Sequence, residues 1–373
     1  MPVLSRADMS MIGRWWWSVD RLSLLALAIL VGFGYVLALA AMPSVTWSLH
    51  DPHTVAMVKQ VMFLAAGGAV MVALSMLSLH QIKLASLGIG IVFLLLTAFT
   101  LIHGTTVDGG RRWIALPGFT IQPSEFLKPA FIIIAAWLLA EHRRTPGFPG
   151  RQIAFGLFAV IFILLKMQPD IGTTALVSAV FFLQLFLDGL NLLWVIVALG
   201  VFVLAGFGAF EFIAHVHTRV MLFLHPNKNS AYQAITALSA FGNGGMFGRG
   251  PGEGQVKHYL PDARADFVFA VAGEEFGLFM CLATILVFAA IVLRGMLRLV
   301  AENDLFVALA AGGLLASFGL QAFVNMASSL SLIPTKGMTL PFISYGGSSV
   351  LAISLQMGLL LALTRRRHQG EFK

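Results

Sequence analysis

Residues 255–277 read QVKHYLPDARADFVFAVAGEEFG and join a polar, glycine-rich stretch to a long apolar run. The run continues to about residue 293, which is more than the roughly 20 residues that a helix needs to cross a hydrocarbon layer. Asp266 stands at the start of the run, and Glu274 and Glu275 lie inside it. Ionisable groups are costly in a membrane helix, so each of these carboxylates is a candidate functional group or half of an ion pair.

The rest of the chain is equally apolar. Of its 373 residues, 58% are hydrophobic and only 11% are charged, which is far from the composition of a soluble globular domain. The sequence therefore predicts an all-α polytopic membrane protein. Its single cysteine, Cys281, cannot form an intrachain disulfide. The net charge of +7 comes from Lys and Arg in short loops and at the ends, a pattern that indicates membrane orientation and anionic lipid and no nucleic-acid partner.

Ten apolar stretches have the length of a membrane-spanning helix. They lie at about residues 22–42, 55–77, 84–102, 123–140, 152–168, 171–188, 190–212, 266–293, 304–327 and 343–364. The basic runs EHRR at 141–144 and RRR at 365–367 favour the cytoplasmic side under the positive-inside rule. Both termini are therefore predicted to be cytoplasmic, with a large extracytoplasmic loop between the seventh and eighth helices.

This topology divides the chain into three parts. They are a cytoplasmic segment 1–21, a single ten-helix domain 22–364 with extracytoplasmic loops at about 103–122 and 213–265, and a basic cytoplasmic tail 365–373. Glycines in the first loop predict turns, and Pro123 suits the first position of the fourth helix. The length of the second loop is typical of a functional or disordered segment, and its aromatic content favours order.

Several polar residues lie within or beside the predicted spans. Glu125 and Lys128 are three apart and so share a helical face, where they either neutralise each other or shape a site. Asp170 suits the first turn of a helix, whose dipole favours an anion, so it is either a cap or a site residue. Gln321 and Asn325 are four apart and are expected to hydrogen-bond between helices.

On a helix that starts at Asp266, the three carboxylates of the opening stretch differ in depth and in direction. A rise of about 1.5 Å per residue places Glu274 and Glu275 roughly 12 to 13 Å deeper. At about 100° per residue, Glu274 points to within about 80° of Asp266 and Glu275 points away. The pattern predicts that Glu274 can share a cavity with Asp266 and that Glu275 pairs elsewhere. Capping of the helix is the alternative role for Asp266.

The ionisable residues near the spans fall toward one side of the predicted membrane. On the extracytoplasmic side lie Glu125, Lys128, Lys166, Asp170, Glu211, Asp266 and Lys336, whereas the cytoplasmic half of most spans is almost bare. A transport path needs polar groups through both halves, but an enzyme acting on a lipid-anchored substrate needs them in one. External Arg and Lys suit a diphosphate group, whose charge they could stabilise.

Four stretches in order resemble the SEDS family of bacterial shape, elongation, division and sporulation proteins. They are RRWIALPGFTIQPSEFLKPA at 111–130, QPDIGTT at 168–174, the glycine-rich stretch 231–277 and LIPTKGMTLPFISYGGSS at 332–349. The similarity spans about residues 20–365, and TKGMTLPFISYGGSS is closer to the division-type branch than to the elongation-type branch.

The resemblance implies a ten-helix fold and a peptidoglycan glycosyltransferase. Such an enzyme polymerises lipid II into glycan strands on the outer face of the bacterial inner membrane, here at the division septum. It implies a class B penicillin-binding transpeptidase and other divisome proteins as partners. Two other classes stay open, a lipid II flippase or transporter and a non-catalytic divisome scaffold.

The family's aspartate motif matches RADFVFA at 264–270, which makes Asp266 the candidate catalytic residue. The sequence departs from the family pattern at Arg264 and Ala265, where His and Thr are usual. Our hypothesis is that Asp266 acts as the general base in an inverting displacement that releases undecaprenyl diphosphate. A divalent cation such as Mg²⁺ could assist, with unassigned ligands. The candidate substrate-binding residues are Arg111, Arg112, Glu125, Lys128, Asp170, Arg249, Arg264, Lys336, Ser344 and Ser348.

Overall fold

The structure is a computed structural model that describes residues 10–40, 52–107, 110–117, 119–212, 217–218, 220–221, 224, 232–334 and 337–366. A helix occupies each of the ten apolar stretches. These helices are α2 (Arg21–Ala40), α3 (Pro52–Leu74), α4 (Leu79–His103), α5 (Pro123–Arg144), α6 (Gly150–Met167), α7 (Ile171–Leu187), α8 (Leu192–Phe212), α11 (Val268–Leu299), α12 (Leu305–Ser329) and α13 (Gly347–Leu363).

Among the described residues, seven helices are long and apolar enough to cross a membrane, namely α2, α3, α4, α5, α6, α11 and α12. The apolar helices α7 and α13 are shorter. A mostly helical membrane protein is thereby confirmed. The full ten-span topology and the side on which each loop lies stay predictions.

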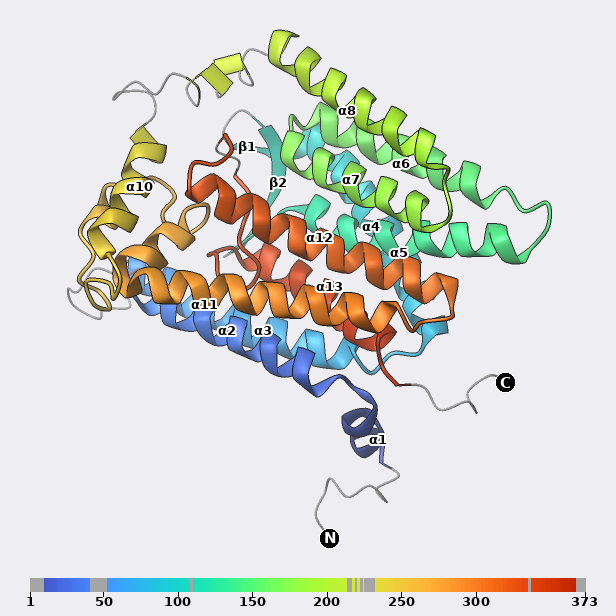
Figure 1. Cartoon of the computed structure of the whole chain (residues 1–373), viewed down its shortest axis with the longest axis horizontal. Coiled ribbons are helices and arrows are strands. Elements are labelled where there is room, and N and C mark those ends of the chain that lie inside the picture. The colour runs from blue at the N-terminus through green and yellow to red at the C-terminus, as the bar shows by residue number, and fades with distance from the viewer. Residues whose placement is uncertain are drawn as a thin grey trace.

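The segment 104–122 departs from an all-helical fold. It forms a three-stranded antiparallel sheet in the order β1 (Thr105–Val107), β2 (Gly110–Leu116) and β3 (Phe119–Ile121). The sequence suggested only turns here, because two of the strands have three residues each and leave no readable alternation. The sheet lies beside the bundle above α12 in Figure 1 and carries Arg111 and Arg112 on β2.

Three shorter elements complete the described chain. They are α1 (Met11–Ser18), α10 (Tyr232–Gly244) and the short 3-10 helix η1 (Val256–His258). The last two belong to the predicted loop 213–265 and lie with its glycine-rich part at the left end of the bundle in Figure 1, around the start of α11. Residues 232–265 of that loop are described and contain these two elements, whereas much of 213–231 lies outside the described residues.

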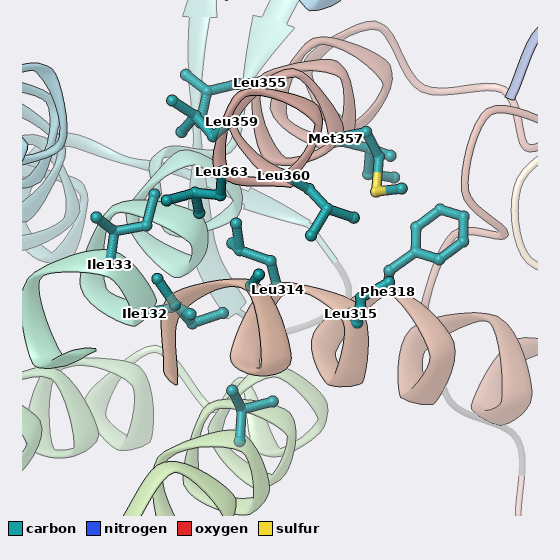
Figure 2. Close-up of a cluster of buried hydrophobic side chains, with 14 of the residues drawn as sticks. Ile132, Ile133, Leu314, Leu315, Phe318, Leu355, Met357, Leu359, Leu360 and Leu363 are labelled. Carbon is teal, nitrogen blue, oxygen red and sulfur yellow. The ribbon is translucent and has the colours of Figure 1, made fainter. Parts of the chain in front are cut away.

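The helices α5, α12 and α13 form the centre of the bundle. Within their most apolar windows, 83% of the residues of α5 and 61% of those of α12 are buried, against 22% for α2, α3, α4 and α6. Figure 2 shows Ile132 and Ile133 of α5 facing Leu314 of α12 and Leu363 of α13 in one apolar cluster. The outer helices therefore present most of their side chains to the surroundings, as expected for lipid contact.

Asp20 ties α2 to the far end of α11. Its carboxylate accepts hydrogen bonds from Nε (2.7 Å) and Nη2 (2.8 Å) of Arg294 and lies 3.0 Å from Arg298. Burial of Asp20 acts to raise its pKa, but hydrogen bonds from Arg294 and Ser23 and the charges of both arginines outweigh burial, so the pKa is lowered. Arg366 donates its N–H to the carbonyl of Ser18 at the same end (2.9 Å).

Candidate functional site

Asp266 lies in a tight turn just before α11. The carbonyl of Asp262 closes this turn by accepting hydrogen bonds from the N–H groups of Ala265 and Asp266, both at 3.0 Å. Phe267 holds the N-cap position and Val268 begins the helix. The expected helix start at Asp266 is therefore two residues too early, and Asp266 is half-buried in the turn.

The backbone segment 337–339 runs past Asp266. A β-carbon at Gly337 would lie 3.0 Å from Oδ2 of Asp266, so the absence of a side chain there leaves room for the carboxylate. The next residue, Met338, packs against α7, where a β-carbon on Gly172 would be 3.4 Å from its Sδ and 4.0 Å from Oδ1 of Asp170. The segment therefore lies between the two aspartates.

Glu125 and Lys128 form a buried ion pair on the central helix α5. Nζ of Lys128 lies 2.9 Å from each carboxylate oxygen of Glu125 and donates a further hydrogen bond of 3.0 Å to Oε1 of Gln321 on α12. Gln321 donates in turn to the carbonyl (3.0 Å) and the hydroxyl (3.2 Å) of Thr339. The predicted pairing on one helical face is confirmed, and it is connected to segment 337–339.

Asp170 has the capping role that the sequence left open, and its carboxylate has further partners. It is the N-cap of α7, where its Oδ1 accepts a hydrogen bond from the N–H of Thr173 (3.2 Å). Its carboxylate also accepts from Nε2 of Gln122 (3.3 Å) and lies 3.7 Å from Nη1 of Arg112. The sheet thus brings a cation to the end of α7, while Arg111, the preceding residue of β2, is exposed.

Three other basic residues were predicted to bind substrate. Arg249 is exposed and donates to the carbonyl (2.8 Å) and the side-chain oxygen (2.7 and 3.1 Å) of Asn243. Arg264 is half-buried in the turn that carries Asp266. Lys336 lies outside the described residues, next to Gly337.

The two predicted serines are both buried near the start of α13. The hydroxyl of Ser344 accepts from the N–H of Leu340 (2.7 Å) and donates to the carbonyl of Ala265. Ser348 lies in the first turn of α13 and is 4% exposed. Ser344 therefore holds the turn of Asp266 in place, and in this arrangement its hydroxyl is already occupied.

Glu274 does not share a cavity with Asp266, contrary to the expectation. Its Oε1 accepts hydrogen bonds from Nδ2 of Asn243 (2.7 Å) and from the N–H groups of Gln255 and Val256 (2.8 Å each), and its Oε2 accepts from the N–H of Lys257 (2.9 Å). The rotation estimate failed because Asp266 lies in a turn, so the regular helix does not extend back to it.

Glu275 pairs elsewhere, as predicted. Nζ of Lys257 lies 2.6 Å from its Oε1, and the N–H groups of Gly252 and Gly254 also donate to the carboxylate. Lys257 reaches further, to the carbonyl of Ala40 at the end of α2 (2.7 Å). The sequence analysis gave Lys257 no role, although two carboxylates inside an apolar run require a compensating cation somewhere.

Metal binding has no dedicated site among the described residues, since no three His, Cys, Asp or Glu side chains come together as ligands there. Mg²⁺ often keeps several waters and binds through one or two carboxylates and substrate phosphates. A divalent cation therefore stays a prediction with no ligands assigned.

Comparison with known proteins covers nearly the whole chain. Residues 20–369 match the profile of the cell cycle protein family of FtsW, RodA and SpoVE. The chain belongs to this family. Its FtsW/RodA/SpoVE relatives include a protein of Caulobacter vibrioides described as a probable peptidoglycan glycosyltransferase FtsW, which is 41% identical over 97% of this chain and 93% of the relative. A Geobacter metallireducens protein of the same description is 34% identical over 93% of this chain and 95% of the relative.

Solved structures of the family share the fold. One is a chain of a peptidoglycan synthase complex, with 26% identity and a TM-score of 0.77 over 94% of this chain and 99% of that chain. Another is the rod shape determining protein RodA of Thermus thermophilus, with 26% identity and a TM-score of 0.69 over 94% of this chain and 97% of that one. The resemblance found in the sequence is confirmed.

Proposed function

We propose that this protein is a division-type peptidoglycan glycosyltransferase that polymerises lipid II at the septum. The observation that carries the proposal is the arrangement around segment 337–339, which brings Asp266, the Glu125–Lys128 pair and the Asp170–Arg112 pair to one end of an apolar bundle. The relatives described as probable peptidoglycan glycosyltransferases support the activity, and their FtsW name supports the division role.

Asp266 acts as the general base in this proposal. Its carboxylate takes the proton from the acceptor sugar hydroxyl while that oxygen attacks the anomeric carbon of the donor. The bond from that carbon to the diphosphate oxygen breaks in the same step, so an α-linked donor gives a β-linked product. Undecaprenyl diphosphate leaves with the bonding electron pair, and the released proton stays on Asp266 until it exchanges with water.

Basic residues stabilise the charge that develops on the leaving diphosphate. Arg112 and Arg264 are the best placed of the described candidates, because one lies beside Asp170 and the other two residues before Asp266. Arg111, Arg249 and Lys336 are assigned to the outer binding surface for the same anion. Lys128 has a different role, since its three N–H donors already face Glu125 and Gln321. We assign the Glu125–Lys128 pair to shaping the site.

The proposed membrane topology follows from the distribution of Lys and Arg along the chain. The ten helices span the inner membrane, with both termini in the cytoplasm and the end that bears Asp266 on the outer face. Lipid II then reaches the site from the outer leaflet. A class B penicillin-binding transpeptidase and other divisome proteins are the proposed partners, and the similarity to a chain of a peptidoglycan synthase complex supports such an assembly.

The decisive experiment measures glycan polymer made from lipid II by the purified protein together with a class B transpeptidase. Wild type should make polymer, and Asp266→Asn should make none while it still folds and binds the partner. Polymer formation at the wild-type rate by Asp266→Asn would overturn the mechanism. ATP-independent movement of labelled lipid II across vesicles without polymerisation would instead favour a flippase, and normal division by cells carrying Asp266→Asn would favour a scaffold.

A further inference from the structure

Two buried amide side chains on α12, Gln321 and Asn325, hold the same piece of backbone. They are four residues apart and so lie one above the other on one face of the helix. Nε2 of Gln321 donates to the carbonyl of Thr339 (3.0 Å), and Nδ2 of Asn325 donates to the carbonyl of Met338 (2.6 Å). Both side chains are almost fully buried, at 2% and 0% exposure. Segment 337–339 is therefore fixed to α12 at two successive carbonyls.

Each amide also contacts a charged residue of the candidate site, Gln321 at the side chain of Lys128 and Asn325 at the backbone of Asp266. Oε1 of Gln321 accepts a hydrogen bond from Nζ of Lys128 (3.0 Å). Nδ2 of Asn325 donates a second hydrogen bond, to the backbone carbonyl of Asp266 (2.9 Å). A continuous chain of hydrogen bonds consequently runs from the ammonium group on α5, through α12 and segment 337–339, to the backbone of the candidate base.

The contact to Asp266 is one of three on consecutive carbonyls. The carbonyl of Arg264 accepts from the N–H of Tyr345 (2.7 Å), that of Ala265 accepts from the hydroxyl of Ser344, and that of Asp266 accepts from Asn325. With three successive peptide units held from outside, the turn has little freedom to rotate. The position of the backbone that carries the Asp266 side chain is thus set by α12 and by the segment that follows it.

We infer that Gln321 and Asn325 are positioning residues, which keep the Asp266 carboxylate and the Lys128 ammonium in fixed relation through segment 337–339 without touching substrate. The inference rests on the proposed function. It requires side chains with N–H donors at both positions, because the groups they hold are carbonyl oxygens. A catalytic base displaced by about 1 Å loses up to about 100-fold in rate even when substrate binding is intact.

The bundle offers a closely matched control in Gln184 on α7. It is 0% exposed, and its Nε2 donates to two backbone carbonyls, those of Ile132 (2.8 Å) and Leu309 (3.2 Å). Within the described part of the chain, its Oε1 and Oδ1 of Asn325 both lack a hydrogen-bond partner. Gln184→Leu therefore removes the same kind of buried donor as Asn325→Leu, but far from Asp266.

The test is steady-state polymerisation of lipid II by the partner-supplemented full chain, with kcat, KM and the pH profile measured for each variant. Asn325→Leu should lower kcat by about tenfold or more, leave KM within about twofold, and shift the acidic limb of the pH profile. Gln184→Leu should lower the melting temperature by a similar amount, with kcat and the pH profile of the folded protein unchanged. Equal kcat, KM and pH profiles for these two variants would overturn the inference.

Gln321 gives a second and independent readout. Gln321→Glu keeps the acceptor for Lys128 but loses the N–H donor to Thr339, whereas Gln321→Met loses both. Both variants should therefore lose activity, and the Glu variant should retain several times more of it than the Met variant. If the two variants were equally active, Gln321 would have no positioning role toward Lys128. A failure of the proposed function looks different, because wild type would then make no polymer or Asp266→Asn would still make it.

Discussion

Replacing Lys257 with Met should release the glycine-rich loop from α11. The side chain of Lys257 is 3% exposed and that of Glu275 is 0% exposed, with 2.6 Å between Nζ and Oε1. Removing one partner of a buried ion pair typically costs 3–5 kcal/mol. Glu275 keeps the N–H donors of Gly252 and Gly254, so we expect the lower limit, about 3 kcal/mol of local stability.

A free-energy loss of this size is measurable as proteolysis of the loop. Each 1.4 kcal/mol is a factor of ten in an equilibrium constant, so about 3 kcal/mol corresponds to roughly a 100-fold larger open population. Trypsin cleavage after Arg249 or Arg264 should accelerate by the same factor when opening is fast compared with cleavage. Mass spectrometry of the fragments over time gives the two rates directly.

Two further variants identify the cause. Glu253→Gln removes a charge from an exposed residue of the same loop and should leave the cleavage rate within about twofold of wild type. Adding Glu275→Gln to Lys257→Met removes the uncompensated carboxylate, so the double variant should be cleaved more slowly than Lys257→Met alone. Cleavage of Lys257→Met at the wild-type rate would refute the conclusion that the Lys257–Glu275 ion pair holds the loop against α11.

Three other predictions concern the stability of the fold. Gly277→Ala should destabilise the protein by at least about 1–3 kcal/mol, because Gly277 has a φ of +76° and its β-carbon would lie 2.4 Å from two backbone atoms. Gly88→Ala, with open space around it, is the control, and equal melting temperatures for the two variants would contradict the prediction. Gly34→Ala places a β-carbon 2.1 Å from the carbonyl of Phe342 and should lower both the melting temperature and polymerisation, whereas unchanged values would mean that the 340–346 segment adapts freely. Asp20 has a lowered pKa, so its stabilising contribution is complete above its unfolded pKa of about 3.9 and is lost as the pH falls through the lower folded value. Asp20→Asn should therefore melt at a lower temperature than wild type at pH 7, with the difference shrinking below about pH 4. A difference in melting temperature that is independent of pH would exclude this linkage.

The helices were predictable from the sequence because each apolar stretch is long and ends in turn residues or charges. The Glu125–Lys128 pair was predictable for a similar reason, since residues three apart on a helix are neighbours. The partners of Gln321 and Asn325 were not, because they are backbone carbonyls of a segment that lies next to α12 only after the chain has folded.

The environment of Glu274 shows a different limit of sequence analysis. One of its four hydrogen bonds comes from Asn243 at the end of α10 and three come from residues 255–257, which the glycine-rich loop brings back to α11. Periodicity along α11 contains no information about a loop that packs against it. The small sheet was missed for a related reason, since strands of three residues gain their stability from pairing and leave little pattern in the chain.

The break in α11 at Gly277 has a consequence for how the protein tolerates different bilayers. Carbonyls of Glu274 and Glu275 accept hydrogen bonds from the N–H groups of Arg249 and Gly250 at the break, so the first turns of α11 are fastened to the loop. A membrane that is thicker or thinner than the hydrophobic length tilts the helices that cross it. The N–H of Leu278, just after the break, also donates to the carbonyl of Gly245 (3.0 Å), so the loop holds both sides of the break and would move with α11 as the helix tilts.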